Sequence, residues 1–180
     1  MLWPVLDEIF CLGLHYDNSL EAVKERQDFL IREKIGICDI VESCRRTKID
    51  ASDLGMLEIR QRNILRQLQL CPSIDTLIFT GGNTKNGPEY LFRRQLRSSY
   101  GLKLDCISSE VPRRHQFILH EKVYTTISLT SPSNAANRAI GSSALYKGCK
   151  AANPYYNTFH FRVDQYRQVF MPKIELMICS

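Results

Sequence analysis

At positions 125–138 the chain reads Thr-Thr-Ile-Ser-Leu-Thr-Ser-Pro-Ser-Asn-Ala-Ala-Asn-Arg. The first half of this stretch is mostly β-branched or apolar, which predicts a buried strand. From Thr130 the residues are small and polar, and Pro132 interrupts them, so we expect a loop to leave the strand. The loop holds hydroxyls, amides and the guanidinium of Arg138 but no carboxylate, a donor set that suits phosphate groups. A polar loop that caps the following helix would account for the same residues.

The composition of the chain is that of a single globular domain. Its 180 residues are 44% hydrophobic, which is enough for a sizeable core. The net charge of +5 is compatible with an anionic partner and does not require one. The chain lacks a long apolar run and a secretory signal, so we expect a cytoplasmic protein without a membrane span. Its seven cysteines are an odd number without a Cys-x-x-Cys pair, which argues against a disulfide framework and a zinc ribbon.

The periodicity of apolar residues predicts alternating helices and strands. We expect helices over 1–11, 20–34, 64–70, 89–99, 139–147 and 161–170, and strands over 37–41, 75–80, 103–107, 116–120 and 123–129. This order predicts an α/β fold: a three-layer α/β/α domain with a central, largely parallel sheet of about four to five strands. Loops beyond the carboxyl ends of parallel strands meet at one edge, so the loops after Val41, Thr80 and Leu129 should converge there.

Two other short stretches lie next to predicted strands. Gly81-Gly82-Asn83 follows one strand and precedes a helix, which can bring backbone amides close to an anion. Its spacing matches neither a dinucleotide fingerprint nor a P-loop, so a nucleotide cofactor is not expected. Cys38-Asp39 lies in another strand, where the carboxylate either bonds nearby loop amides or accepts a ligand N–H group. The basic cluster of Arg45, Arg46 and Lys48 is either a solvated loop or a phosphate contact.

Together these stretches resemble a known family. Residues 35–44 and 49–54 read Ile-Gly-Ile-Cys-Asp-Ile-Val-Glu-Ser-Cys and Ile-Asp-Ala-Ser-Asp-Leu. They resemble the Gly-Ile-x-x-Asp-Val-x-x-Ser-Cys … Leu-Asp-Ser-Asp-Ile pattern of the hypoxanthine-active branch of the uracil-DNA glycosylase superfamily. Residues 131–138 resemble its Pro-Ser loop, residues 2–6 its Phe-Trp-Pro segment, and residues 76–82 its central strand and turn. The similarity runs from Leu2 to about Phe170.

The resemblance implies an enzyme that removes a deaminated base, such as uracil or hypoxanthine, from double-stranded DNA after flipping it out of the stack. The partner is then a duplex with a damaged or mismatched base, and we expect a monomer. No metal or organic cofactor is implied, because DNA phosphates can stabilise the sugar cation. The base pocket would comprise Cys38, Asp39, Gly81 and Asn83. The DNA contacts would be Ser131, Pro132, Ser133 and Asn134, with Asn137 and Arg138 as the wedge that replaces the flipped base.

The chain also departs from the family pattern. The first motif of the family precedes the Phe-Trp-Pro segment and has no counterpart in residues 1–180, so we expect a single domain shortened at its N-terminus. Cys38 stands where the branch often has tryptophan. The catalytic residue is therefore left unassigned. Three functions are open at this point: a glycosylase, a non-catalytic DNA-binding relative, and an unrelated α/β enzyme or small-ligand binder.

Overall fold

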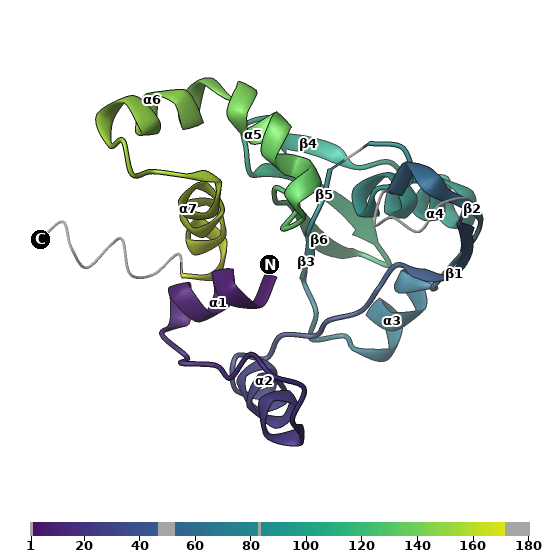
Figure 1. Cartoon of the computed structure of the whole chain (residues 1–180). Helices are drawn as coiled ribbons and strands as arrows, with labels where there is room; N and C mark the ends of the chain where they lie inside the picture. Colours follow the sequence, from purple (N-terminus) through teal and green to yellow (C-terminus); the bar gives the residue numbers. More distant parts are fainter. Residues whose placement is uncertain (1, 47–52, 83, 172–180) are drawn as a thin grey trace, which may run out of the picture.

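A computed structural model describes residues 2–46, 53–82 and 84–171 (Figure 1). Two short 3-10 turns, η1 (Asp53–Gly55) and η2 (Asn134–Ala136), accompany the regular elements. In chain order those elements are α1 (Leu2–Phe10), α2 (Leu20–Arg32), β1 (Val41–Arg46), β2 (Met56–Gln61), α3 (Ile64–Leu70), β3 (Thr76–Phe79), α4 (Pro88–Tyr100), β4 (Asp105–Ser108), β5 (Arg113–Leu119), β6 (Lys122–Ser128), α5 (Asn137–Ser142), α6 (Ala144–Ala152) and α7 (Thr158–Phe170).

Several helix ends follow directly from local capping chemistry. The Ser19 hydroxyl accepts a hydrogen bond from the amide of Ala22 at 3.1 Å, so α2 begins where the sequence predicts. Asn63 caps α3 in the same way, and Gly101 ends α4 with a left-handed φ of 68°. At its C-terminus α2 ends two residues before the predicted limit, at Arg32, and Lys34 takes a positive φ of 56° just after it.

The main sheet has the strand order β3-β6-β5-β4, and only the pair β3–β6 is parallel. The β6–β5 and β5–β4 pairs are antiparallel, so the prediction of a largely parallel sheet is wrong. The reason is local. His120 and Glu121, with φ of 49° and 63°, form a two-residue turn between β5 and β6, and such a turn can join only antiparallel strands.

The strand predicted over 37–41 is also wrong, because β1 starts at Val41 and pairs antiparallel with β2 in a separate two-stranded sheet. Asp39 accepts the amide of Val41 at 2.9 Å, which turns the chain immediately before the strand. The hairpin carries cross-strand ion pairs on exposed side chains, Arg45–Glu58 and Arg60–Glu42. Charged residues of this kind do not suit a central strand that is buried on both faces.

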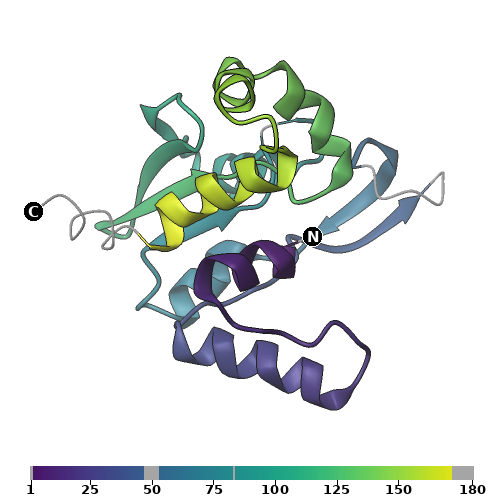
Figure 2. The same ribbon diagram turned by 60° about the vertical axis from the view of Figure 1, so that its left-hand side comes forward.

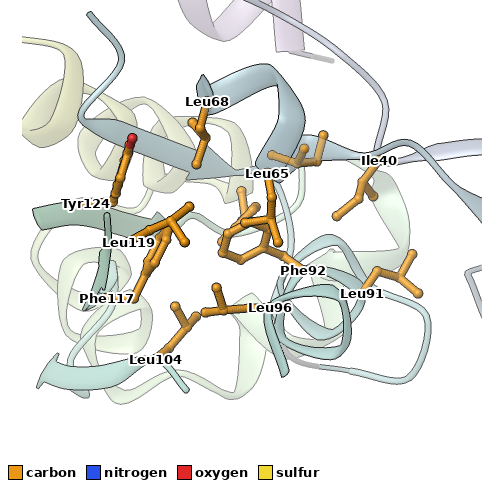
Figure 3. Close-up of a cluster of buried hydrophobic side chains, with 12 residues drawn as sticks. Ile40, Leu65, Leu68, Leu91, Phe92, Leu96, Leu104, Phe117, Leu119 and Tyr124 are labelled. Atoms are coloured by element: carbon orange, nitrogen blue, oxygen red, sulfur yellow. The ribbon is translucent and has the colours of Figure 1, made fainter. Parts of the chain in front are cut away.

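Helices cover both faces of the main sheet (Figures 1 and 2). On one face, α3 and α4 pack Leu65, Leu68, Leu91, Phe92 and Leu96 against apolar side chains of β5 and β6 (Figure 3). On the other face, α1 and α7 enclose a second cluster that comprises Val5, Ile9, Leu129, Val163 and Tyr166. The molecule is therefore a mixed α/β domain with three layers.

The helix predicted over 139–147 is divided in two. Ser143 ends α5 and caps α6 through its hydroxyl, which accepts the amide of Tyr146. The second helix, α6, continues through Ala152, five residues beyond the predicted end at Lys147.

Candidate nucleic-acid interface

The loops after β3 and β6 leave the sheet side by side. The two strands are parallel and in register, with Phe79 opposite Ser128, and the amide of Leu129 donates to the carbonyl of Phe79 at 2.9 Å. The chain therefore turns away at Thr80 and at Thr130 from neighbouring positions on one edge. This is the edge at which the sequence predicts a site, although only two of the three expected loops arise from strands of this sheet.

The loop from Thr130 to Asn137 is held from inside by a buried arginine on α7. Arg162 has an exposed fraction of 0%. Its Nε donates to the carbonyl of Ser131 at 2.9 Å, and its Nη2 donates to the carbonyl of Ser133 at 2.8 Å and to Oδ1 of Asn137 at 2.9 Å. Its Nη1 donates to the Thr158 carbonyl of its own helix at 3.0 Å. One guanidinium thus determines the path of the loop.

Two further side chains of α7 complete this support. Tyr166, which is fully buried, donates its hydroxyl proton to the carbonyl of Thr130 at 3.0 Å. The side-chain oxygen of Gln165 accepts the amide of the same residue at 3.3 Å. Burial raises the pKa of Tyr166 well above its ordinary value, so its hydroxyl stays a donor. Both backbone groups of Thr130 are therefore bonded where the loop begins.

The outer side of the loop carries the residues predicted to contact DNA. The hydroxyls of Ser131 and Ser133 each accept a loop amide at 3.2 Å, so both contribute to the turn. Pro132 is half-buried, and Asn134 is exposed. Arg138 is exposed too, and within the described residues it makes no hydrogen bond or ion pair.

Asn137 is placed differently from the wedge role that the resemblance implies. Its side chain is half-buried, and Oδ1 accepts the Arg162 guanidinium, so the residue braces the loop from inside. Of the two predicted wedge residues, Arg138 is the one whose side chain is exposed and uncommitted among the described residues.

The turn after β3 is closely packed against its surroundings. Gly81 is buried, and a Cβ on Gly87 would lie 2.6 Å from the carbonyl oxygen of Gly82, so no side chain fits there. Asn86 has a φ of 64°, and its buried amide donates to the carbonyls of Asp53 and Met56 at 3.0 and 3.1 Å. These bonds connect the turn to the β1–β2 hairpin. Asn83, predicted for the base pocket, lies outside the described residues.

A buried carboxylate at this edge was not predicted from the sequence. Glu89, 1% exposed in the first turn of α4, accepts Nε of Arg93 at 2.8 Å through Oε1. Its Oε2 accepts the Ser128 hydroxyl at 2.6 Å and the Arg113 guanidinium at 3.1 Å. Burial raises the pKa of Glu89, but the hydrogen bonds from Ser128 and Arg93 and the charge of Arg113 outweigh it and hold the pKa below its usual range. The carboxylate therefore neutralises two arginines beside the candidate site.

His115 extends this polar cluster into the sheet. Its Nε2 lies 2.9 Å from Nη2 of Arg93, and because arginine only donates, Nε2 is the acceptor and the ring proton resides on Nδ1. Burial lowers the pKa of His115, and the charge of Arg93 lowers it further, so the imidazole is neutral at pH 7. The only sequence signal for the cluster is a set of polar side chains at positions that alternate with core residues on β5 and β6.

Cys38 and Asp39, the other predicted pocket residues, are exposed and lie in the connection between α2 and β1. Ile40 anchors them, because it is buried against the α3 and α4 side chains (Figure 3). Partial desolvation of its thiol raises the pKa of Cys38 above its ordinary value. Burial, with a smaller contribution from the Asp39 charge, raises the pKa of Asp53, whose backbone carbonyl accepts the Asn86 amide. Among the described residues, no hydrogen bond or ion pair joins Asp39 to the Thr130–Asn137 loop.

The chain has no match among models of protein families, curated proteins or solved structures. Within residues 2–46, 53–82 and 84–171, no group of three or more histidine, cysteine or acidic side chains is placed to hold a metal ion. None of the helices in the described part of the chain has both the length and the hydropathy needed to cross a bilayer. We therefore infer the function from the residues of the site and their geometry.

Proposed function

We propose that this chain belongs to a DNA base-excision glycosylase that hydrolyses the N-glycosidic bond of a deaminated base, such as uracil or hypoxanthine, after base flipping. The observation that carries the proposal is the loop braced by Arg162. Its carbonyls are bonded to buried α7 side chains, whereas Ser133, Asn134 and Arg138 face solvent. A loop that is already ordered loses little conformational entropy when it binds a phosphate backbone.

The surroundings of the loop support the same proposal. Gly81 and Gly82 leave the neighbouring strand at the same edge, so a nucleotide held by the loop would lie beside them. The arginines of this edge are paired with Glu89, so the uncommitted guanidinium that we assign to DNA is that of Arg138. Because the Glu89 carboxylate neutralises the arginines behind the loop, an anion would bind at Arg138 and not at those arginines.

The experiment that tests the function uses duplexes with a single uracil, hypoxanthine or xanthine, and an undamaged duplex as control. Each is incubated with the protein, and abasic sites are scored by strand cleavage in alkali. Abasic sites that form only in a damaged duplex would establish the glycosylase. Binding to the duplexes at low salt without abasic sites would identify a non-catalytic DNA-binding relative. A protein that neither binds nor cleaves would contradict both and favour an unrelated α/β protein.

Replacing Arg138 with alanine should weaken binding to a damaged duplex by about 1–3 kcal/mol, the range for one specific arginine contact. The side chain has no intramolecular bond among the described residues, so the fold should be unaffected. Fluorescence anisotropy with a labelled duplex at low salt measures the change. Arg66→Ala on α3 removes an equally exposed guanidinium and serves as the control. Equal affinities for Arg138→Ala and the wild-type protein would remove Arg138 from the interface.

Changing Asp39 to asparagine should alter base preference more than overall affinity. Asparagine keeps the oxygen that accepts the Val41 amide, so the turn before β1 is retained, but the side chain gains an N–H₂ group and loses its charge. The ratio of the dissociation constants for uracil and hypoxanthine duplexes should shift by about tenfold, the effect of one charged hydrogen bond. An unfolded variant, seen by circular dichroism, would show that Asp39 is a structural cap; an unchanged ratio would exclude it from the pocket.

A further inference from the structure

The part of the chain that runs from β6 through the braced loop to the first turns of α7 has an unusual charge distribution. From position 122 to position 163 the chain contains no aspartate or glutamate, and it contains five basic residues. This stretch includes α5, α6 and the turn that leads into α7. We call residues 137–157 the α6 arm. In both views it lies at the opposite end of the molecule from α2 (Figures 1 and 2).

Three of the five basic side chains have structural partners. Arg162 supports the loop, Lys122 donates to the carbonyls of Pro72 and Ile74, and Lys150 donates to the carbonyls that follow α6. The other two are Arg138 and Lys147. Both are exposed, and neither makes a hydrogen bond or ion pair in the part of the chain that the structure describes.

The turn after α6 presents an aromatic ring to solvent. Lys150 donates to the carbonyls of Pro154 at 3.2 Å and of Tyr156 at 3.0 Å, and Asn153 accepts the amide of Tyr155 at 3.0 Å. These bonds order the backbone of the turn, and Tyr155 is nevertheless 88% exposed. Tyr156 points the other way, into a cluster with Tyr146, and donates its hydroxyl to Asp164 at 2.5 Å.

One side of α6 packs through Tyr146 against Tyr156 and Phe161, and the rest of the helix faces solvent. The helix has no buried residue, and Leu145 is 59% exposed. The exposed cations of Arg138 and Lys147 are complementary to a nucleic-acid backbone, and in the described part of the chain the one carboxylate bonded to the arm, that of Asp164, accepts the Tyr156 hydroxyl. An exposed aromatic ring beside lysine is the typical platform for an unpaired base. A base inside a duplex offers no π-face to such a ring, so Tyr155 favours a strand whose bases are unpaired.

We propose that the α6 arm binds a single-stranded stretch of DNA beside the target base, with Lys147 on a phosphate and Tyr155 stacked on an unpaired base. The inference rests on the proposed DNA-binding function and names its substrate class: duplexes with an unpaired flank. Because α5 starts at Asn137, which is bonded to Arg162, the arm is directly continuous with the braced loop.

The test compares a labelled duplex of roughly 20 base pairs with the same duplex carrying a single-stranded overhang, by fluorescence anisotropy. The wild-type protein should bind the overhang substrate about tenfold more tightly, the effect of stacking one base. Tyr155→Ala should abolish this difference, and Tyr155→Phe, which keeps the ring, should retain it. Lys147→Glu should weaken binding and reduce the dependence of log K on log salt concentration by about one. Lys24→Glu on α2 makes the same charge change far from the arm and should leave both values unchanged.

The outcomes separate the two proposals. If the wild-type protein binds both duplexes equally, or if Tyr155→Ala keeps the preference, the arm proposal is overturned while DNA binding stands. If the protein binds neither duplex at low salt, the proposed function is overturned as well. Binding to anionic vesicles that depends on Lys147, without binding to DNA, would assign the arm to a membrane surface and also overturn the proposal.

Discussion

Replacing Arg162 with alanine should lower the free energy of unfolding by at least about 3 kcal/mol, because three backbone carbonyls would lose a charged donor at once and the buried side chain would leave a cavity. The guanidinium is fully buried and donates to the carbonyls of Ser131, Ser133 and Thr158 and to Asn137. No other described side chain donates to the first two of these carbonyls. Urea unfolding followed by circular dichroism measures the change, and duplex binding should be lost along with the order of the loop.

A graded set of variants distinguishes the loop from the fold as a whole. Arg162→Lys retains the charge but not the fork that reaches both sides of the loop, so it should fold and still bind DNA poorly. Tyr166→Phe removes a single hydrogen bond, to the Thr130 carbonyl, and should cost only about 1 kcal/mol. If Arg162→Lys bound DNA as tightly as the wild-type protein, the bracing of the loop would be irrelevant to binding.

Glu89→Gln should lower the free energy of unfolding by about 3 kcal/mol, the lower end of the range for breaking one side of a buried ion pair. The carboxylate is buried, whereas Arg93 and Arg113 keep partial contact with water, which softens the loss. The glutamine has nearly the same volume, so the effect comes from the unpaired arginines and not from a cavity. An unchanged midpoint in urea would show that the pair contributes no net stability.

From the lowered pKa of Glu89 we also predict how the free energy of unfolding depends on pH. The folded pKa of Glu89 is lower than its ordinary value of 4.5, so the stabilisation is complete above that pH and is lost as pH falls through the folded pKa. The Glu89→Gln variant should lack this part of the acid loss. It should keep the loss of stability that comes from His115. The pKa of His115 is lower in the folded protein, so the unfolded chain binds the proton first and the protein becomes less stable as the pH falls below about 6.5. Urea unfolding at several pH values from neutral to acidic measures both slopes.

Much of the secondary structure was predictable because its causes lie within a few residues. Ser19 and Asn63 cap helices through amides three positions away, and Gly101 ends a helix through its own φ. The sequence around His120 also contained the information that β5 and β6 are antiparallel, since the turn is too short for a crossover. The alternation of helices and strands favours a parallel sheet, which is wrong here. The strand predicted over 37–41 is absent for another reason, because Asp39 turns the chain just before Val41.

The candidate site was predictable only in part. The Ser131–Arg138 loop and the Gly81–Gly82 turn do leave adjacent strands at one edge, as expected from the end of each strand. That Asp39 faces the same nucleotide is a proposal, since its hydrogen bonds within the described residues join it to Val41 and Arg62 and not to either loop. Arg162 and Glu89 were missed, because a lone polar residue on an amphipathic helix gives no sign that it faces inward.

By itself, the sequence determined the helices, their caps, the apolar strands and a loop free of carboxylates, all of which depend on neighbours a few positions apart. Only the tertiary structure decided which side chains hold that loop and which remain exposed. Arg162 reaches Ser131 across 31 positions, and Ser128 reaches Glu89 across 39. Such pairs form because the sheet and its two helical layers bring distant segments together, and a buried charge persists only where those segments supply its partners.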